Sequence, residues 1–124
     1  MKGSAAIRKA SITSKKVAIS IAKFASDKKA EDIVVLDMRK QVNFCDYFVI
    51  CSATSDRLVR AIADNIEEEL GKMGVTLSTK GAVRHSNWIV LDTGDVIAHV
   101  FQKQVREFYN LEGLWQEAKQ ISLE

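Results

Sequence analysis

The chain has 124 residues, of which 47% are hydrophobic and 27% charged, which is the balance of a single soluble globular domain. Its 18 basic and 16 acidic residues leave a net charge of only +2, and this small surplus argues against a protein held to nucleic acid mainly by counterion release. The absence of proline excludes collagen-like and proline-rich linker sequences. The longest apolar run falls far short of the roughly 20 residues that a membrane helix requires.

The charge is distributed unevenly along the chain. Residues 1–40 carry ten basic and four acidic side chains, a net charge of +6, whereas residues 41–124 carry eight and twelve, a net charge of −4. The basic beginning predicts a flexible tail over residues 1–13, followed by one domain over residues 14–121. The first 26 residues contain six basic side chains and no acidic one, which also resembles an organellar transit peptide, and that alternative stays open.

The first elements in chain order are a helix and two strands. Apolar residues recur at helical spacing over residues 17–25, which predicts a helix with Ser14 as its N-cap and an end near residues 28–29. The short apolar runs at residues 33–36 and 47–51 are typical of buried strands.

A longer amphipathic helix follows, with Ser55 as its N-cap and an end at Gly71 or Gly74. Its predicted apolar face consists of Leu58, Ala61, Ile62, Ile66, Leu70 and Met73. After this helix, we expect a brief strand at residues 75–77 and a loop over the polar residues 78–87.

Residues 88–92 and 96–101 predict a β-hairpin around a short glycine-containing turn. Alternation in its second strand places Ile97, His99 and Phe101 on one face of the sheet. Val96, Ala98 and Val100 lie on the other face. An amphipathic C-terminal helix with Gly113 as a weak point is indicated by Val105, Phe108, Leu111, Trp115, Ala118 and Ile121. This order of elements predicts an α+β fold, a single domain with a mixed β-sheet and flanking helices.

Residues that could support enzyme chemistry are scattered. Asp92 and Asp95 are separated by a turn, so they do not form the pair of carboxylates on one strand face that metal-dependent nucleotidyl transfer uses. Residues 52–55 are the nearest approach to a phosphate-binding loop, but they contain neither glycine nor lysine, so helix capping is the favoured interpretation.

Metal and disulfide sites are not indicated either. Cys45 and Cys51 are too far apart in an extended segment for a disulfide and are interpreted as small core residues. With His85 and His99 they lack the spacing of a structural zinc site, which is a minor alternative. We expect His85 to be exposed and His99 to be a hydrogen-bonded core or edge residue rather than a functional one.

Aromatic and charged residues concentrate towards the C-terminal end, at Trp88, Phe101, Arg106, Phe108, Tyr109, Glu112 and Trp115. Tryptophan, tyrosine and arginine are enriched at the energetic centres of protein interfaces. Core packing accounts equally well for Phe108 and Trp115, but not for Arg106, Tyr109 and Glu112. The residues alone therefore indicate a small α+β interaction module.

Several ordered motifs resemble the ribosomal silencing factor family, also called the Iojap family. The motifs are Lys29 to Asp37, Asp46 to Ile50, Ser55 with Arg57, Trp88 to Asp92, Gly94 to Val96, His99 to Phe101, Arg106, Phe108-Tyr109, Leu111-Glu112 and Leu114-Trp115. The similarity covers about residues 15–121. Ala53 departs from it, because the family commonly has glycine there.

The resemblance implies a fold similar to nucleotidyltransferases but without their catalytic carboxylates, and a non-enzymatic translation factor. Such proteins bind ribosomal protein fourteen of the large subunit and sterically block joining of the small subunit, which lowers translation when nutrients are scarce. The expected partner surface consists of Trp88, Asp92, His99, Arg106, Tyr109, Glu112, Leu114 and Trp115.

The resemblance further implies no metal or cofactor, ribosomal RNA at most as a minor contact, no membrane association, and a bacterial cytoplasmic location unless the basic tail directs the chain to an organelle. Whether the protein is a monomer or a homodimer stays open. The alternative function is a nucleotidyltransferase-like nucleotide-binding domain.

Overall fold

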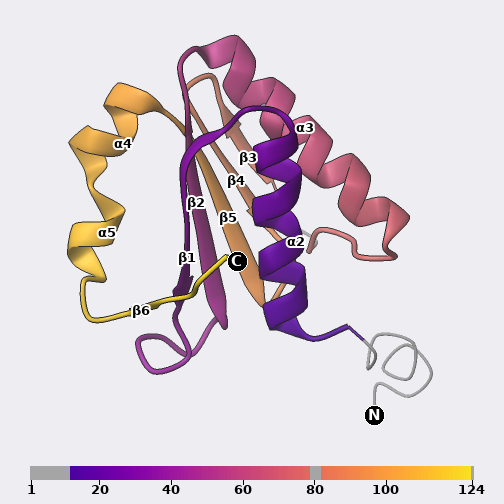
Figure 1. Ribbon diagram of the computed structural model, residues 1–124, viewed down its shortest axis with the longest axis vertical. Helices are drawn as coiled ribbons and strands as arrows, with labels where there is room; N and C mark the ends of the chain where they lie inside the picture. The colour runs from indigo at the N-terminus through magenta and orange to yellow at the C-terminus, as the bar shows by residue number, and fades with distance from the viewer. Residues whose placement is uncertain (1–11, 79–81, 124) are drawn as a thin grey trace.

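The computed structural model describes residues 12–78 and 82–123, and in this part of the chain a six-stranded mixed sheet carries helices on both faces (Figure 1). The predicted α+β fold with flanking helices is thereby confirmed. The tail predicted for residues 1–13 falls, up to residue 11, outside the described residues.

The strand order across the sheet is β3-β4-β5-β2-β1-β6, and the central pair β2 and β5 is parallel. The strands are β1 (Glu31–Asp37), β2 (Tyr47–Ala53), β3 (Ala82–His85), β4 (Trp88–Asp92), β5 (Val96–Gln102) and β6 (Lys119–Gln120). β4 and β5 pair antiparallel, which confirms the predicted hairpin. Every residue of β2 is buried, because this strand is central and covered on both faces.

Two layers of side chains cover the sheet. The helices α2 (Ser14–Asp27) and α3 (Asp56–Lys72) pack on one face against a large cluster that includes Val96, Ala98 and Val100 of β5. On the other face, a smaller cluster around Phe48 and Phe101 lies under α4 (Lys103–Tyr109) and α5 (Leu111–Leu114). The predicted alternation of β5 is therefore confirmed, and it assigns His99 and Phe101 to the smaller cluster's side.

The N-cap of α2 is Thr13 and not the predicted Ser14. The Thr13 hydroxyl accepts a hydrogen bond from the Lys16 backbone N–H at 3.0 Å. The Ser14 hydroxyl instead donates to the Asp46 carboxylate at 2.8 Å. The two residues have similar capping propensity, so their order could not be decided locally. A tertiary contact to Asp46 decided it.

The second helix has the predicted N-cap, since the Ser55 hydroxyl accepts from the Leu58 N–H at 3.1 Å. Its buried face consists of Val59, Ile62, Ala63, Ile66 and Leu70. The assignment of Ala61 to that face is wrong, because the helix is rotated so that Val59 and Ala63 point inward and Ala61 is exposed. The helix passes through Gly71, and Gly74 follows it in the left-handed region at φ +82°.

The segment between α3 and β4 differs from the prediction in two ways. Residues 75–77 form no strand, although Val75 and Leu77 pack against the main cluster. β3 instead lies inside the predicted loop, and all four of its residues are exposed. An exposed edge strand shows no apolar alternation, so its sequence resembles a loop. Arg84 of β3 forms ion pairs with Asp64 and Glu67 of α3.

The C-terminal segment is not one helix, which corrects the prediction. α4 ends at Asn110, whose φ of +49° is left-handed, and α5 and β6 then follow separately. The break falls at Asn110 rather than at Gly113, because asparagine tolerates the left-handed conformation and its side chain accepts a hydrogen bond from the Gly113 N–H. One consequence is that Phe108, whose spacing suits a core residue, is 81% exposed.

The two cysteines are buried with free thiols, which confirms their interpretation as core residues. Burial raises the pKa of Cys51 to about 12, and burial followed by nearby carboxylates raises that of Cys45 to about 11. Both thiols are therefore protonated and unreactive at neutral pH.

Candidate partner-binding surface

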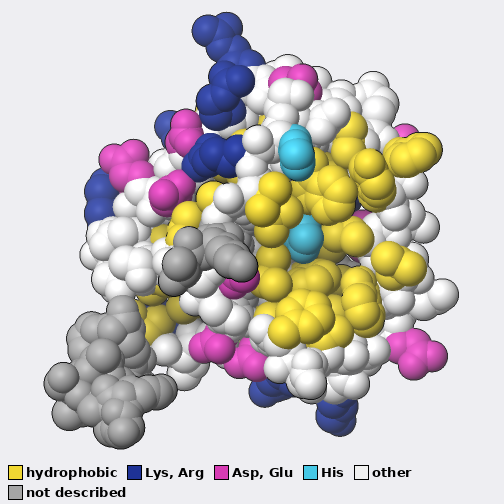
Figure 2. Space-filling model, turned by 180° about the vertical axis from the view of Figure 1, so that it is seen from behind, with side chains coloured by type: hydrophobic (Ala, Val, Ile, Leu, Met, Phe, Trp, Pro, Cys, Tyr) yellow, Lys and Arg dark blue, Asp and Glu magenta, His cyan; other side chains and the backbone are white. Residues whose placement is uncertain are grey.

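One side of the molecule presents a continuous apolar surface. We define the aromatic surface as the exposed or half-buried residues Trp88, Phe108, Tyr109, Leu114 and Trp115. Figure 2 shows hydrophobic side chains gathered across the face seen from behind, with histidine side chains among them and most charged side chains towards the margins. Phe108, Tyr109 and Leu114 are 81%, 50% and 70% exposed, so α4 and α5 present this surface outward.

Ring contacts hold the aromatic surface on the sheet. Trp88 lies across from Phe101 in the β4–β5 pair, with ring centroids 4.7 Å apart, and its other neighbour is Tyr109 at 4.8 Å. Trp115 meets the edge of Phe48 at 6.3 Å. Rigid aromatic rings on a sheet provide contact area that is already ordered before a partner arrives.

His99 supports this arrangement from beneath. The Trp88 indole Nε1–H donates to His99 Nδ1 at 3.2 Å, so the hydrogen of the neutral imidazole must lie on Nε2. Burial lowers the pKa of His99 to about 4, which keeps the ring neutral at physiological pH. His99 Nε2 has no hydrogen-bond partner among the described residues. The expectation of a fully hydrogen-bonded histidine is thus met at only one of the two nitrogens.

Arg106 and Glu112 are brought together inside the fold. The Arg106 guanidinium binds one Glu112 oxygen through Nε at 3.1 Å and Nη2 at 2.5 Å. Its Nη1 donates to the Ser52 hydroxyl at 2.8 Å and to the Asp32 carbonyl at 2.6 Å. The Arg106 side chain is only 11% exposed. The inference that internal packing cannot explain Arg106 and Glu112 is therefore wrong. Through these hydrogen bonds, the two side chains connect the α4–α5 turn to the ends of β1 and β2.

Asp92 is separated from the aromatic surface. It ends β4, four residues beyond Trp88, which corresponds to roughly 13 Å along an extended strand. Its carboxylate accepts from the Gly94 N–H at 2.7 Å, and Gly94 has a φ of +103°. Asp92 thus stabilises the hairpin turn.

A groove of about 690 Å³ opens beside the aromatic surface, between the β3–β4 turn and α4. It is lined by His85, Ser86, Asn87, Trp88, Gln104, Val105, Phe108 and Tyr109. The side chains of Trp88, Phe108 and Tyr109 therefore border both the groove and the aromatic surface. Sequence reasoning did not include Phe108 in the partner surface. Its position directly before Tyr109 could have indicated that Phe108 belongs to the same surface.

The residues that come nearest to an enzyme site are engaged within the fold. Ser52 accepts from Arg106, and Ser55 caps α3, so both serine hydroxyls of residues 52–55 have internal partners. Within residues 12–78 and 82–123, no group of three or more His, Cys, Asp or Glu side chains could hold a metal ion. In the same described part, no helix is both long and apolar enough to cross a membrane. The exposed side chains of Phe108, Tyr109 and Leu114 favour binding through apolar contact.

Comparisons with known proteins point to one family. The family model for "Ribosomal silencing factor during starvation" matches residues 11–124. The ribosomal silencing factor of Bacillus subtilis is 41% identical over 98 residues, covering 79% of this chain and 83% of the relative. The chloroplastic Iojap protein of Zea mays is 38% identical over 106 residues, covering 86% of this chain and 46% of that protein.

Solved structures support the fold independently. A crystal structure of a protein from Chromobacterium violaceum superposes with a TM-score of 0.81 at 28% identity, covering 85% of this chain and 88% of that one. The sequence matches extend over nearly the whole described domain, including the elements that carry the aromatic surface. The chain belongs to the ribosomal silencing factor family.

Proposed function

We propose that this protein binds ribosomal protein fourteen of the large ribosomal subunit through the aromatic surface and sterically prevents the small subunit from joining. It thereby represses translation when nutrients are limited. It acts by occupying a surface and not by catalysis, and it uses no cofactor. We place it in the bacterial cytoplasm, with an organelle as the alternative because a relative is named as chloroplastic.

The observation that carries the proposal is the exposure of Phe108, Tyr109 and Leu114 beside the half-buried Trp88. Exposed aromatic patches of this kind mark interaction sites, and aromatic anchors supply most of the energy in protein interfaces. Residues 41–124, which include this surface, have a net charge of −4, which suits a basic ribosomal protein and favours fast association.

The direct test uses Tyr109→Ala and, as a matched control, Phe44→Ala. Both side chains are aromatic and about half exposed, at 50% and 58%, but Phe44 lies in the β1–β2 loop, outside the groove. We expect Tyr109→Ala to weaken co-sedimentation with isolated large subunits by about tenfold or more, as loss of an interface anchor does. It should also restore subunit joining, while Phe44→Ala behaves as the unaltered protein.

Full-strength binding by Tyr109→Ala would reject the aromatic surface as the docking site. The enzyme alternative is tested by calorimetry with ATP and magnesium, where clear binding heat and turnover would contradict a purely steric mechanism. Light scattering of the free protein distinguishes a monomer from a homodimer, and neither result conflicts with ribosome binding.

A further inference from the structure

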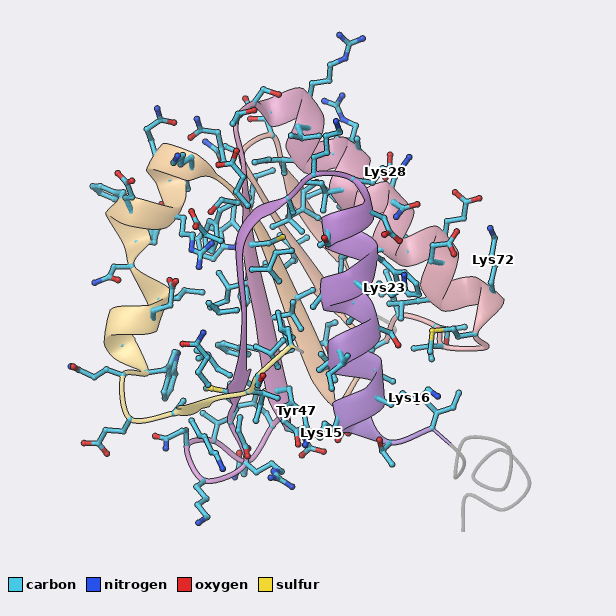
Figure 3. The ribbon with its side chains drawn as sticks, viewed as in Figure 1. Lys15, Lys16, Lys23, Lys28, Tyr47 and Lys72 are labelled. Atoms are coloured by element: carbon cyan, nitrogen blue, oxygen red, sulfur yellow. The ribbon has the colours of Figure 1, made fainter. Side chains whose placement is uncertain are left out.

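Exposed lysines are spread along α2, three within the helix and one at its C-cap. Figure 3 shows Lys15 and Lys16 at the beginning of the helix, Lys23 in its middle and Lys28 at its end. All four side chains are exposed. From Lys15 to Lys28 the helix rises by roughly 20 Å. We call these four residues the lysine face. Since α2 packs on the opposite side of the sheet from Phe48 and Phe101, the lysine face and the aromatic surface lie on different sides of the molecule.

The charges of the lysine face are not neutralised within the fold. Within residues 12–78 and 82–123, ion pairs join Lys72 to Glu69 and Lys103 to Glu31, but none includes a lysine of this face. Asp27 is the one acidic residue of α2 itself. Four unpaired ammonium groups on one helix create a local positive field that the overall charge of +2 conceals.

Stability of the helix does not account for Lys15 and Lys16. Both lie in the first turn of α2, which contains no acidic residue. The backbone N–H groups give this end of a helix a partial positive charge, so lysine is unfavourable there and Asp or Glu is preferred. The Asp46 carboxylate lies at this end of α2, bound to the Ser14 hydroxyl, but among the described residues it forms no ion pair with either lysine. A residue choice that opposes the local rule is expected where a surface serves binding.

We infer that the lysine face binds the phosphate backbone of RNA. Lysine ammonium groups contact phosphates as point charges and read no sequence, so they fit a backbone contact. The apolar side of α2 is buried in the core, which leaves it unable to insert into a membrane as an interfacial helix would. The choice of RNA as the polyanion rests on the proposed function, because a ribosomal subunit presents RNA around its proteins.

The experiment measures binding of the full chain to protein-free RNA extracted from large subunits, across a series of salt concentrations. The test variant combines Lys15→Gln, Lys16→Gln and Lys23→Gln. The control combines Arg57→Gln, Arg60→Gln and Lys72→Gln on α3, which changes the net charge equally. Raising the salt concentration from about 50 to about 200 mM should weaken RNA binding by both proteins. If the three lysines each contact one phosphate, the loss of affinity should be roughly 20- to 40-fold larger for the unaltered protein than for the test variant. The control should keep the salt dependence of the unaltered protein.

A second readout separates binding from folding. Removing Lys15 and Lys16 relieves the unfavourable interaction with the helix dipole, so the thermal midpoint of the test variant should be unchanged or higher while its RNA affinity falls. An unchanged salt dependence in the test variant, or an equal loss in the control, would overturn the inference. The inference would also be overturned if the three lysines were needed for binding to phosphatidylglycerol vesicles but not for binding to RNA. Because this titration contains no ribosomal protein, it tests whether the lysine face binds RNA even if the Tyr109→Ala result rejects the proposed docking surface.

Discussion

Trp88 donates its indole hydrogen to Nδ1 of His99 across the β4–β5 pair, at 3.2 Å. This bond requires a neutral imidazole, because a protonated His99 would carry hydrogens on both nitrogens and could not accept. The orientation of the Trp88 side chain is thus coupled to the protonation state of the buried His99.

The stability of the protein should depend on pH through His99. Its pKa is lowered by burial to about 4, whereas the unfolded chain titrates near 6.5. The unfolded state therefore takes up the proton first as pH falls, so the contribution of His99 is complete above pH 6.5 and declines towards pH 4, by at most about 3 kcal/mol. Urea unfolding at several pH values measures this loss.

The control for this titration is His99→Phe, which keeps an aromatic ring but cannot titrate. It should be less stable at neutral pH by about 1–2 kcal/mol, because the Trp88 indole loses its acceptor. Its stability should also vary less between pH 6.5 and 4. Parallel pH curves for both proteins would show that another group is responsible.

Arg106 and Glu112 should act on partner binding indirectly, through the α4–α5 turn. We expect Arg106→Ala and Glu112→Ala each to lower the free energy of unfolding by about 2 kcal/mol, since either change leaves the other charge unpaired in a largely enclosed site. The double variant should lose less than the sum of the two single losses. Chemical denaturation measures the three values. Additive losses would mean that the two side chains do not support each other.

Thr13 and Ser14 give a sharp test of the α2 cap. Thr13→Ala removes the hydroxyl that accepts from the Lys16 N–H and should cost about 1 kcal/mol. Ser14→Ala removes only the hydrogen bond to Asp46 and leaves the cap intact. Comparing the thermal midpoints of the two variants distinguishes Thr13 from Ser14 as the N-cap. A larger decrease for Ser14→Ala would contradict Thr13 as the cap.

Gly113→Ala should disturb the turn at Asn110. A Cβ on Gly113 would come within 2.9 Å of the Asn110 Cγ, so the asparagine side chain must move and give up its hydrogen bond to the Gly113 N–H. A loss of about 1 kcal/mol is expected, as for other capping bonds. Gly71→Ala is the control, because nothing lies within 4 Å of its added methyl. It should be neutral or slightly stabilising, since alanine favours the helix.

Local sequence patterns were sufficient to predict the elements in which apolar residues form a continuous run or recur at regular spacing. The hairpin of β4 and β5, the buried strand β2 and the Ser55-capped helix α3 follow from apolar periodicity and capping chemistry, which are local properties. The ordered motifs also identified the family, because many residues in register are specific where a single motif is not.

The contacts that those residues make depend on how distant parts of the chain pack together. Periodicity does not distinguish a core phenylalanine from Phe108, which is exposed because the left-handed Asn110 ends its helix. Spacing could not reveal that Arg106 binds Ser52, 54 residues away in sequence. A net charge of +2 likewise says nothing of where charge gathers, and only the orientation of α2 on the sheet separates its lysines from the aromatic surface. Contacts between distant residues depend on the packing of the whole chain, which no local pattern encodes.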